Sequence, residues 1–571
     1  MTGLDWAVLA GSLALMVAVG TLQTRRSGTL DGYLLAGREL RWVSITLSIM
    51  ATQARAITFL STPGQAYVDG MRFVQFYFGL PLAMVVLAAV AVPAYHRLRV
   101  RTAYEFLEQR LDVKTRTLTA GLFLVQRGLA AGLTIFAPSL ILSVTLGWDL
   151  YVTNAVIGVL VVVYTTTGGT RAVSRTQNLQ VLIIVVGMAG AFIVALRSLP
   201  SGVGFLDAVK IAGEAGRLNA IDLSFSLSDR YSLWSGLIGG FFLALAYFGT
   251  DQSQVQRYLA GSSVTESRLG LLANGLFKVP MQFGILFLGA IVFAFYQLTP
   301  PPLFFNPVES QRARDSVLGQ EYRALEHRHH QASAAQGRHL EGWLAAQRKG
   351  DAAAAANALG QARQAREEAA AARAAGIDLL GQASGSAPGT DTNYIFLGFV
   401  TTFLPAGLLG LVLAAVFAAS MSSTAAELNA LASTTVVDFF RRLVHPGASE
   451  RTLVQVSRLA TVFWGAVAVG FAEYANRLGS LVEAVNILGS LFYGTILGVF
   501  ALAFLSPRVS GTAAFVAALA AEAAVVACFL LTPLSFLWYN VVGCLGTVAV
   551  GFLLSPVLPR RSNGNRSVEA G

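Results

Sequence analysis

The chain has 571 residues, of which 54% are hydrophobic and only 13% are charged, whereas charged residues make up about 25% of ordinary soluble domains. Apolar runs recur from residue 6 to residue 558, and many of them reach the roughly 18 residues that cross about 30 Å of hydrocarbon. This composition excludes a water-soluble globule and indicates an all-α protein that crosses the membrane many times. No polar block at either end is large enough for a soluble enzyme or nucleic-acid-binding domain, so the net charge of +10 needs another explanation.

Apolar runs bounded by charged residues or by Pro and Gly predict thirteen membrane helices. They lie near residues 5–22, 42–68, 73–95, 117–146, 150–168, 177–196, 232–250, 269–297, 393–424, 455–474, 478–506, 510–531 and 536–558. One set of loops carries 22 Lys and Arg residues, and the opposite set carries six when residues 308–391 are left aside. The positive-inside rule therefore predicts an outside N-terminus and a cytoplasmic C-terminal tail in a cell-membrane protein. The first run lacks a basic leader and a cleavage site, so a retained helix is expected.

Residues 308–391 differ from the rest because they hold ten acidic residues, ten basic residues and four of the six histidines. Two Ala-rich helical patterns, near 310–349 and 351–379, are separated by Lys349-Gly350-Asp351. They predict an extracytoplasmic helical hairpin. Neighbouring imidazoles such as those of His327, His329 and His330 can ligate zinc or copper. No Cys or well-spaced acid completes a closed ligand set, so a solvated helix surface is the favoured interpretation.

Two of the predicted spans are too polar or too broken for a continuous helix in lipid. Residues 44–64 include Thr52, Gln53 and Arg55, and a second break follows Tyr247 at residues 249–252. Such breaks are tolerated only where they line a cavity, and a matching pair indicates an inverted-repeat transporter with its site at the repeat interface. Close packing of glycine-rich helices would explain Gly249 but not Arg55.

Three further features inside the spans each have a functional and a structural interpretation. Ser422 and Ser423 could give oxygen ligands to a small cation, or could bond back to carbonyls one turn earlier. Lys278 is costly in an apolar stretch and suggests a pathway or a partner, unless it reaches toward the cytoplasmic end of its helix. Arg127 presents the same choice as Lys278.

Several motifs in consecutive order resemble those of the sodium:solute symporter family, which includes sodium/glucose, sodium/iodide and sodium/multivitamin carriers. They are Tyr164-Thr-Thr-Thr-Gly168-Gly169 with Thr176-Gln-Asn-Leu-Gln180, Gly249-Thr-Asp251-Gln-Ser-Gln-Val-Gln256-Arg257, and Ala418-Ala-Ser-Met-Ser422-Ser423 with Leu428-Asn429 and Ser433 to Asp438. Residues 102–110 and 136–142 lean toward the iodide and multivitamin branch. The resemblance implies a leucine-transporter-like core of two inverted five-helix repeats, with one leading and two trailing helices, in agreement with the thirteen predicted spans.

On this resemblance the chain divides into five parts. They are a leading helix and loop (1–41), a first repeat (42–200), an extracytoplasmic loop (201–231), a second repeat (232–506) interrupted by the 308–391 hairpin, and two trailing helices with a short tail (507–571).

The resemblance also assigns candidate site residues. A sodium ion would be bound by the carbonyls of Ala51, Ala54 and Ala419 and the hydroxyls of Ser422 and Ser423. The substrate cavity would include Thr58, Tyr247, Lys278 and Asn486.

Two departures from the family pattern affect this site. Many members have Asp after the Thr where this chain has Thr176-Gln177, so a second sodium is not expected. Arg55 stands where a small residue is usual. It could take the place of sodium as a tethered cation, pair with an anionic substrate, or pack against an acid of a neighbouring helix.

The main hypothesis is a secondary active transporter, not an enzyme, that moves a small organic solute with sodium by alternating access. Sodium is transported and is not a fixed cofactor. The expected partners are the solute, sodium and the lipid bilayer, without nucleic acid, and the chain is expected to work as a monomer. The alternatives are a proton-coupled or facilitative transporter on the same fold, and a transporter-like sensor, for which the short tail offers no signalling domain. The sequence does not name the solute.

Overall fold

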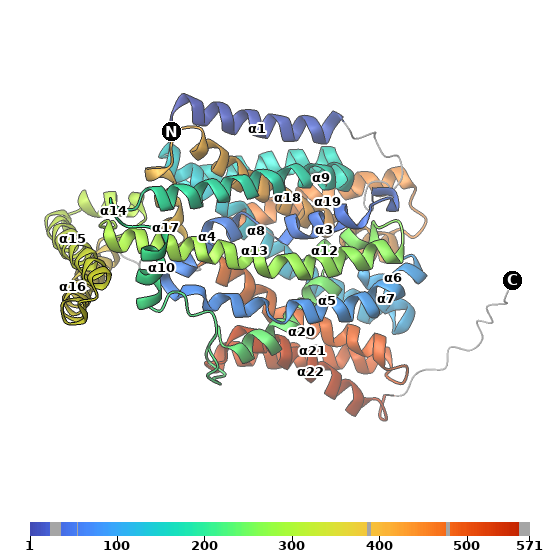
Figure 1. Ribbon diagram of the computed structural model, residues 1–571. Helices are drawn as coiled ribbons and strands as arrows, with labels where there is room; N and C mark the ends of the chain where they lie inside the picture. Colours follow the sequence, from blue (N-terminus) through green and yellow to red (C-terminus); the bar gives the residue numbers. More distant parts are fainter. Residues whose placement is uncertain (23–35, 54, 385–389, 476–479, 559–571) are drawn as a thin grey trace.

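The computed structural model describes residues 1–22, 36–53, 55–384, 390–475 and 480–558, and for residues 16, 17, 19–22, 164, 167–179, 383 and 384 it describes the backbone alone. Helices dominate the described part, which contains no β-strand. Figure 1 shows a long bundle with a helical hairpin across one end. The all-α prediction is confirmed.

The first half of the bundle begins with the leading helix α1, Gly3–Leu22, and a short turn, η1, Ala36–Arg38. The helices that follow are α3 (Trp42–Gln53), α4 (Ala56–Asp69), η2 (Gly70–Tyr77), α5 (Leu80–Ala89), α6 (Ala91–Leu98), α7 (Ala103–Arg110), α8 (Val113–Leu146) and α9 (Leu150–Arg197).

The second half follows a surface helix, α10, Phe205–Glu214. It contains η3 (Ser235–Gly239), α11 (Gly240–Gly249), α12 (Gln252–Leu259), α13 (Val264–Leu298), α17 (Thr392–Phe403), α18 (Leu408–Thr434), η4 (Thr435–Val444), α19 (Glu450–Ala472), α20 (Leu481–Leu505), α21 (Gly511–Leu531) and α22 (Phe536–Leu554).

Three predicted spans have different boundaries in the structure. Residues 150–168 and 177–196 belong to one helical segment, α9. Asn154 in its early part donates to Glu473, the residue after α19, and its late part lies against α18 at Gly187. The single span predicted at 393–424 is instead two helices, α17 and α18. The break contains Pro405, which lacks an amide hydrogen, and Gly407, whose φ of 87° favours glycine.

The two polar breaks expected from the sequence are present. One lies between the end of α3 at Gln53 and the start of α4 at Ala56. The other lies between α11 and α12, where the Asp251 carboxylate accepts a hydrogen bond from the Ser253 amide at 2.9 Å and so caps α12. Both breaks lie inside the bundle, since Arg55 is 6% exposed and Asp251 is 1% exposed.

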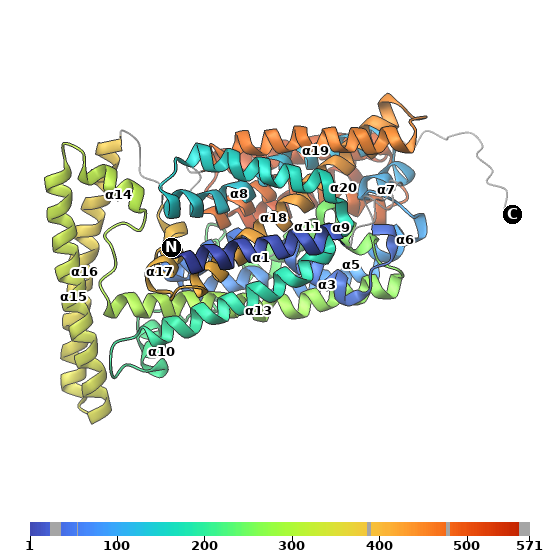
Figure 2. The same ribbon diagram turned by 90° about the horizontal axis from the view of Figure 1, so that it is seen from above.

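Residues of the predicted hairpin form two long helices, α15 (Gly319–Lys349) and α16 (Ala352–Ser384), preceded by the short α14 (Pro307–Arg314). Gly350 ends α15 in the left-handed conformation, as the Lys-Gly-Asp break suggested. Figure 2 shows the hairpin lying across the end of the bundle. Arg348 pairs with Asp207 of α10 at 2.5 Å, and Arg363 pairs with Glu214 of the same helix.

The histidine cluster differs from the expected solvated surface. His327 and His330 are exposed, but His329 is 4% exposed and its Nδ1 lies 3.0 Å from the Ala369 carbonyl of α16. Among the described residues, no group of three His, Cys, Asp or Glu side chains is placed to hold a metal ion. His329 is therefore a packing residue of the hairpin.

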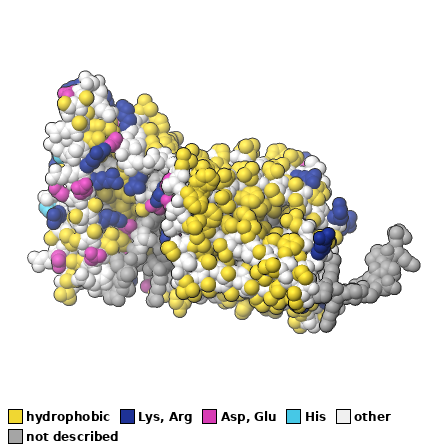
Figure 3. Space-filling view, turned by 90° about the horizontal axis from the view of Figure 1, so that it is seen from below, with side chains coloured by type: hydrophobic (Ala, Val, Ile, Leu, Met, Phe, Trp, Pro, Cys, Tyr) yellow, Lys and Arg dark blue, Asp and Glu magenta, His cyan; other side chains and the backbone are white. Residues whose placement is uncertain are grey.

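The outer surface fits a membrane protein. The described residues include nine helices that are long and apolar enough to cross a bilayer, together with three shorter apolar helices. Figure 3 shows apolar side chains covering the bundle, while Lys and Arg side chains lie on the hairpin and at the opposite end of the bundle.

Candidate functional site

A small cavity lies between the two helix breaks. Its volume is about 80 Å³, and three of the four predicted substrate residues line it together with Arg55. The lining comes from the α3/α4 break, η2, α8, α11 and α20 and comprises Gln53, Arg55, Ile57, Thr58, Phe76, Tyr77, Gln126, Arg127, Leu243, Tyr247, Val482, Val485, Asn486 and Tyr493. The fold therefore brings Thr58, Tyr247 and Asn486 together from three separate segments.

The fourth predicted substrate residue, Lys278 of α13, lies one layer behind the cavity. Its Nζ is 5.6 Å from the centre of the Tyr77 ring, and Tyr77 lines the cavity. The side chain is 1% exposed, so its ammonium does not reach the surface as the snorkelling interpretation required. Within the described part of the chain, Nζ has no hydrogen-bond partner.

Arg55 pairs with an acid on a neighbouring helix. Its Nη2 lies 2.8 Å from Oε1 of Glu427 on α18 and donates to the Tyr247 hydroxyl at 3.4 Å. The same Tyr247 hydroxyl accepts a hydrogen bond from Gln254 at 2.6 Å. Of the three roles considered for Arg55, the structure shows the ion pair with a neighbouring helix, while the guanidinium still lines the cavity.

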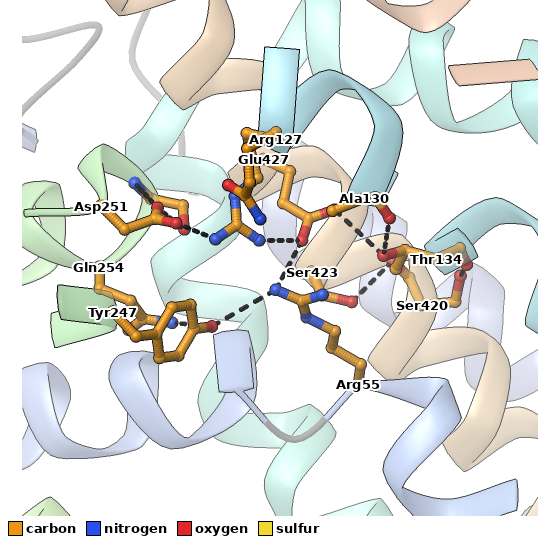
Figure 4. A network of polar contacts seen from close by, with 12 residues as sticks. Arg55, Arg127, Ala130, Thr134, Tyr247, Asp251, Gln254, Ser420, Ser423 and Glu427 are labelled. Carbon is orange, nitrogen blue, oxygen red and sulfur yellow. Dashed lines mark hydrogen bonds and ion pairs between the residues drawn. The ribbon is translucent and has the colours of Figure 1, made fainter. Parts of the chain in front are cut away.

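Arg127 of α8 joins this pair to the second helix break. Its Nη1 lies 2.9 Å from the same Glu427 oxygen, and its Nη2 pairs with Asp251. Tyr493 of α20 completes the contact by donating to Asp251 at 2.9 Å. Figure 4 shows Arg55, Arg127, Asp251 and Glu427 pointing toward one another from four different segments. Arg127 therefore has acidic partners inside the bundle and does not reach toward the end of its helix.

The four charges of this network balance. Arg127 and Glu427 are 0% exposed, Asp251 is 1% exposed and Arg55 is 6% exposed. Removing ions from water costs several kcal/mol each unless they are paired and hydrogen-bonded. Two guanidinium groups facing two carboxylates satisfy that condition, and this explains how such polar segments persist inside an apolar bundle.

The predicted sodium residues lie beside this network. Ser422, Ser423 and Ala419 are buried on α18, and Ala51 is buried in the last turn of α3, which packs on α18. Ala54 lies outside the described residues. The Ser423 hydroxyl donates to the Ala419 carbonyl at 2.7 Å, so the back-bonding expected of such a hydroxyl is present and its oxygen lone pairs stay available.

A chain of hydroxyl contacts connects the serine run to the charges. The Ser423 hydroxyl is also 3.3 Å from the Ser420 carbonyl, and Ser420 donates to the Thr134 carbonyl at 2.9 Å. Thr134 in turn donates to Oε2 of Glu427 at 3.1 Å. Ser423, one of the sodium candidates, therefore belongs to the same polar unit as the Arg55 pair (Figure 4).

The sequence did not predict Glu427, Tyr493 or Thr134 as site residues, and it did not predict that Asp251 is an ion-pair partner. Glu427 and Asp251 carried a usable signal, because an isolated acid within an apolar span requires a partner. Their pairing with Arg55 and Arg127 could not be read from the sequence, since the four residues are up to 372 positions apart. The Thr176-Gln177 departure concerns side chains outside the described part.

Broken helices around a buried polar cavity in a many-helix membrane bundle define a secondary transporter. The sequence pattern of the sodium:solute symporter family matches residues 33–315 and 371–521, so the chain belongs to that family. It is therefore a sodium-coupled solute symporter, with sodium as a transported ion. The match leaves out residues 316–370, which form most of the hairpin.

Several named proteins are similar to this chain. It is 28% identical to the sodium-coupled monocarboxylate transporter 1 of Homo sapiens, over 90% of this chain and 71% of that protein. It is 26% identical to the sodium-dependent multivitamin transporter of Oryctolagus cuniculus, over 90% of this chain and 68% of that protein. It is 24% identical to the sodium/sialic acid symporter NanT of Aliivibrio fischeri, over 98% and 95% of the two chains.

A solved structure shares the fold. A Na⁺-coupled sialic acid symporter in a substrate-bound, outward-open state superposes with a TM-score of 0.74 at 22% identity, covering 98% of this chain and 99% of that one. The leucine-transporter-like architecture expected from the sequence is confirmed.

Proposed function

We propose that the transported solute is a small organic carboxylate that binds in the cavity between the helix breaks. The observation that carries this proposal is the pair of guanidinium groups, Arg55 and Arg127, in the wall of the small cavity. Guanidinium and carboxylate groups form strong bidentate pairs, and sites built from convergent donors select ligands that accept from them.

The size of the cavity favours a solute of few atoms. Its 80 Å³ is well below the roughly 300–1,000 Å³ of pockets for drug-sized ligands. The similarity to a sodium-coupled monocarboxylate transporter supports the same class. A larger carboxylate of the sialic acid kind, supported by the similarity to NanT, is the second candidate and would require the cavity to expand.

In this proposal sodium is held by the hydroxyls of Ser422 and Ser423 and the carbonyls of Ala51, Ala54 and Ala419. Thr58, Tyr247 and Asn486 surround the solute, and Lys278 adds positive potential from behind Tyr77. The end of the bundle rich in Lys and Arg faces the cytoplasm by the positive-inside rule, and the hairpin faces outward. A monomer holds the complete site.

Uptake into proteoliposomes tests the solute class. Acetate, propionate, lactate and pyruvate are compared with their amides, which match them in size but carry no charge. Accumulation of the acids under an inward sodium gradient, with no accumulation of the amides, is expected. Uptake of amides or of sugars in place of the acids would contradict the proposal, and uptake of sialic acid alone would favour the second candidate.

A further inference from the structure

Glu427 is the shared partner in the buried network. Its Oε1 accepts from both Arg55, at 2.8 Å, and Arg127, at 2.9 Å, while its Oε2 accepts from Thr134. One carboxylate oxygen thus holds two cations, and Arg127 has Asp251 as a second acid. Arg55 has Glu427 as its one acidic partner among the described residues. Loss of Arg55 would leave Glu427 still paired.

Glu427 lies one helical turn after Ser423 on the same face of α18. The contacts through Ser420 and Thr134 join the two residues. A carboxylate next to hydroxyl and carbonyl oxygens is a favourable ligand set for a hard cation, because each ligand is an oxygen and one carries a full negative charge. In the present arrangement the Arg55 guanidinium holds that carboxylate.

The cavity wall contains polar atoms that lack protein partners. Arg127 Nε, a donor, and Gln126 Oε1, an acceptor, are both without a hydrogen-bond partner in the described structure. Arg127 is 0% exposed and Gln126 is 1% exposed, and both line the cavity. A buried unsatisfied polar group costs about 1–3 kcal/mol, so these atoms indicate a polar ligand at this place.

We propose that sodium and Arg55 compete for Glu427. In the structure described here Arg55 holds the carboxylate. When sodium enters between Ser422, Ser423 and the last turn of α3, Glu427 becomes an additional ligand of the ion, and Arg55 turns its guanidinium into the cavity to pair with the solute carboxylate. The inference rests on the proposed function, because it requires an anionic solute.

The exchange of Arg55 for sodium at Glu427 would couple sodium binding to solute binding, because it keeps the charges of the site balanced. The empty site holds two arginines and two acids. The loaded site adds one sodium, neutralised by Glu427, and one solute carboxylate, neutralised by Arg55, while Arg127 keeps Asp251. Each charge of this four-residue network is paired in both states, whereas binding of either ligand alone leaves one charge of the network or its ligand without a counterpart. Each ligand therefore favours binding of the other, as linkage requires.

The test is sodium affinity in Arg55→Gln, measured without solute by thermal stability of the purified protein across a NaCl series, with choline chloride as the ionic control. Removal of the competing guanidinium should raise apparent sodium affinity about tenfold, within the usual range of coupling between sites. Carboxylate uptake should be lost in the same variant. Arg363→Gln, which removes an exposed arginine paired with Glu214, serves as the matched control and should match the native protein.

Two further variants make the result decisive. Glu427→Gln should lower sodium affinity about tenfold. If this single change impairs folding, the double variant Arg55→Gln with Glu427→Gln should restore it, because it removes one charge of each sign. Sodium should still bind weakly to the double variant. Unchanged or weaker sodium binding in Arg55→Gln overturns the exchange. So does a native protein that ignores sodium while Arg55→Ser acquires sodium dependence, because Arg55 would then replace the ion permanently. If the native protein binds sodium but no carboxylate, the proposed solute class fails instead.

Discussion

At the scale of single residues, the hydroxyls of Ser422 and Ser423 are the simplest part of the site to change. Replacing both with Ala should lower apparent sodium affinity by at least tenfold, since one polar contact to a charged group already contributes about 1.5–3 kcal/mol and about 1.4 kcal/mol is a factor of ten. Folding should be little affected, because the Ser423 hydroxyl bonds within its own helix. Sodium dependence of uptake measures the effect.

Thr401→Ala is the control for this pair, since the Thr401 hydroxyl likewise bonds back within its helix, to the Leu397 carbonyl at 2.9 Å. An unchanged sodium dependence in the double serine variant would exclude these hydroxyls as ligands.

Asp251 should matter for stability as well as for transport. Asp251→Asn leaves Arg127 with Glu427 alone, and breaking one side of a buried ion pair costs about 3–5 kcal/mol. The melting temperature in detergent should fall, and Arg127→Gln added to Asp251→Asn should recover part of the loss because the unpaired charge is removed. If the loss of stability in the double variant equals the sum of the losses in the two single variants, the two groups do not interact.

The family resemblance predicted part of this site but not its pairing. Thr58, Tyr247 and Asn486, which the resemblance assigned to the substrate cavity, line one cavity together with Arg55. The position of Lys278 behind Tyr77 depends on how α13 is rotated about its axis, which a nearly uniform apolar sequence does not specify. The role of Glu427 could not be predicted, because its partners lie on other segments of the chain.

At the scale of elements, the hairpin depends on the buried imidazole of His329. Burial lowers its pKa below the ordinary value of 6.5 despite the nearby Ala369 carbonyl. Above pH 6.5 the residue is neutral in both folded and unfolded hairpins. Below it the unfolded hairpin binds the proton more readily, so the free energy of unfolding falls as the pH falls.

Hydrogen exchange in α15 and α16 at pH 7.5 and pH 5.0, corrected for the intrinsic exchange rates, should show loss of protection at the lower pH. His329→Gln should reduce this difference, while His327→Gln, at an exposed position, should leave it unchanged. Equal acid sensitivity in both variants would mean that another group is responsible.

Element boundaries were predictable where a local signal exists. Gly350 ends α15 and the polar run near Arg55 breaks the first core helix, as expected. The break between α17 and α18 was also signalled by Pro405 and Gly407, but the surrounding apolar residues concealed it. In α9 the Gly168-Gly169 pair suggested a loop, and the helix instead continues through it.

At the scale of the whole molecule, most of the hairpin should be dispensable. Replacing residues 320–368 with a short Gly/Ser linker should preserve at least partial uptake, because the change in loop length costs little in closure entropy. The larger replacement of residues 312–386 should be more damaging. It removes Arg373, which pairs with Asp391 at 2.8 Å and 2.9 Å, next to the start of α17. Complete loss of uptake in a correctly inserted 320–368 variant would show that the hairpin takes part in transport.

The charge balance of the site predicts electroneutral transport. One sodium moving with one monocarboxylate carries no net charge, so the final accumulation ratio of the solute should not change when a potassium diffusion potential is imposed with valinomycin. Accumulation that rises with an inside-negative potential would require more than one cation per carboxylate and would contradict the single sodium site.

The anchoring of α18 has a mechanical consequence. At one end Asp5 of α1 accepts hydrogen bonds from the Gly407 and Gly410 amides at 2.7 Å and 3.2 Å. At the other end Asp438 of η4 is bound by Arg116 at 2.7 Å and by Thr102 at 2.9 Å. Because both ends of α18 are held by hydrogen bonds and ion pairs, we expect α18 to stay in place during the transport cycle. The conformational change that opens and closes the cavity would then occur in other helices, and the leading helix, outside the ten-helix core, would help to hold α18.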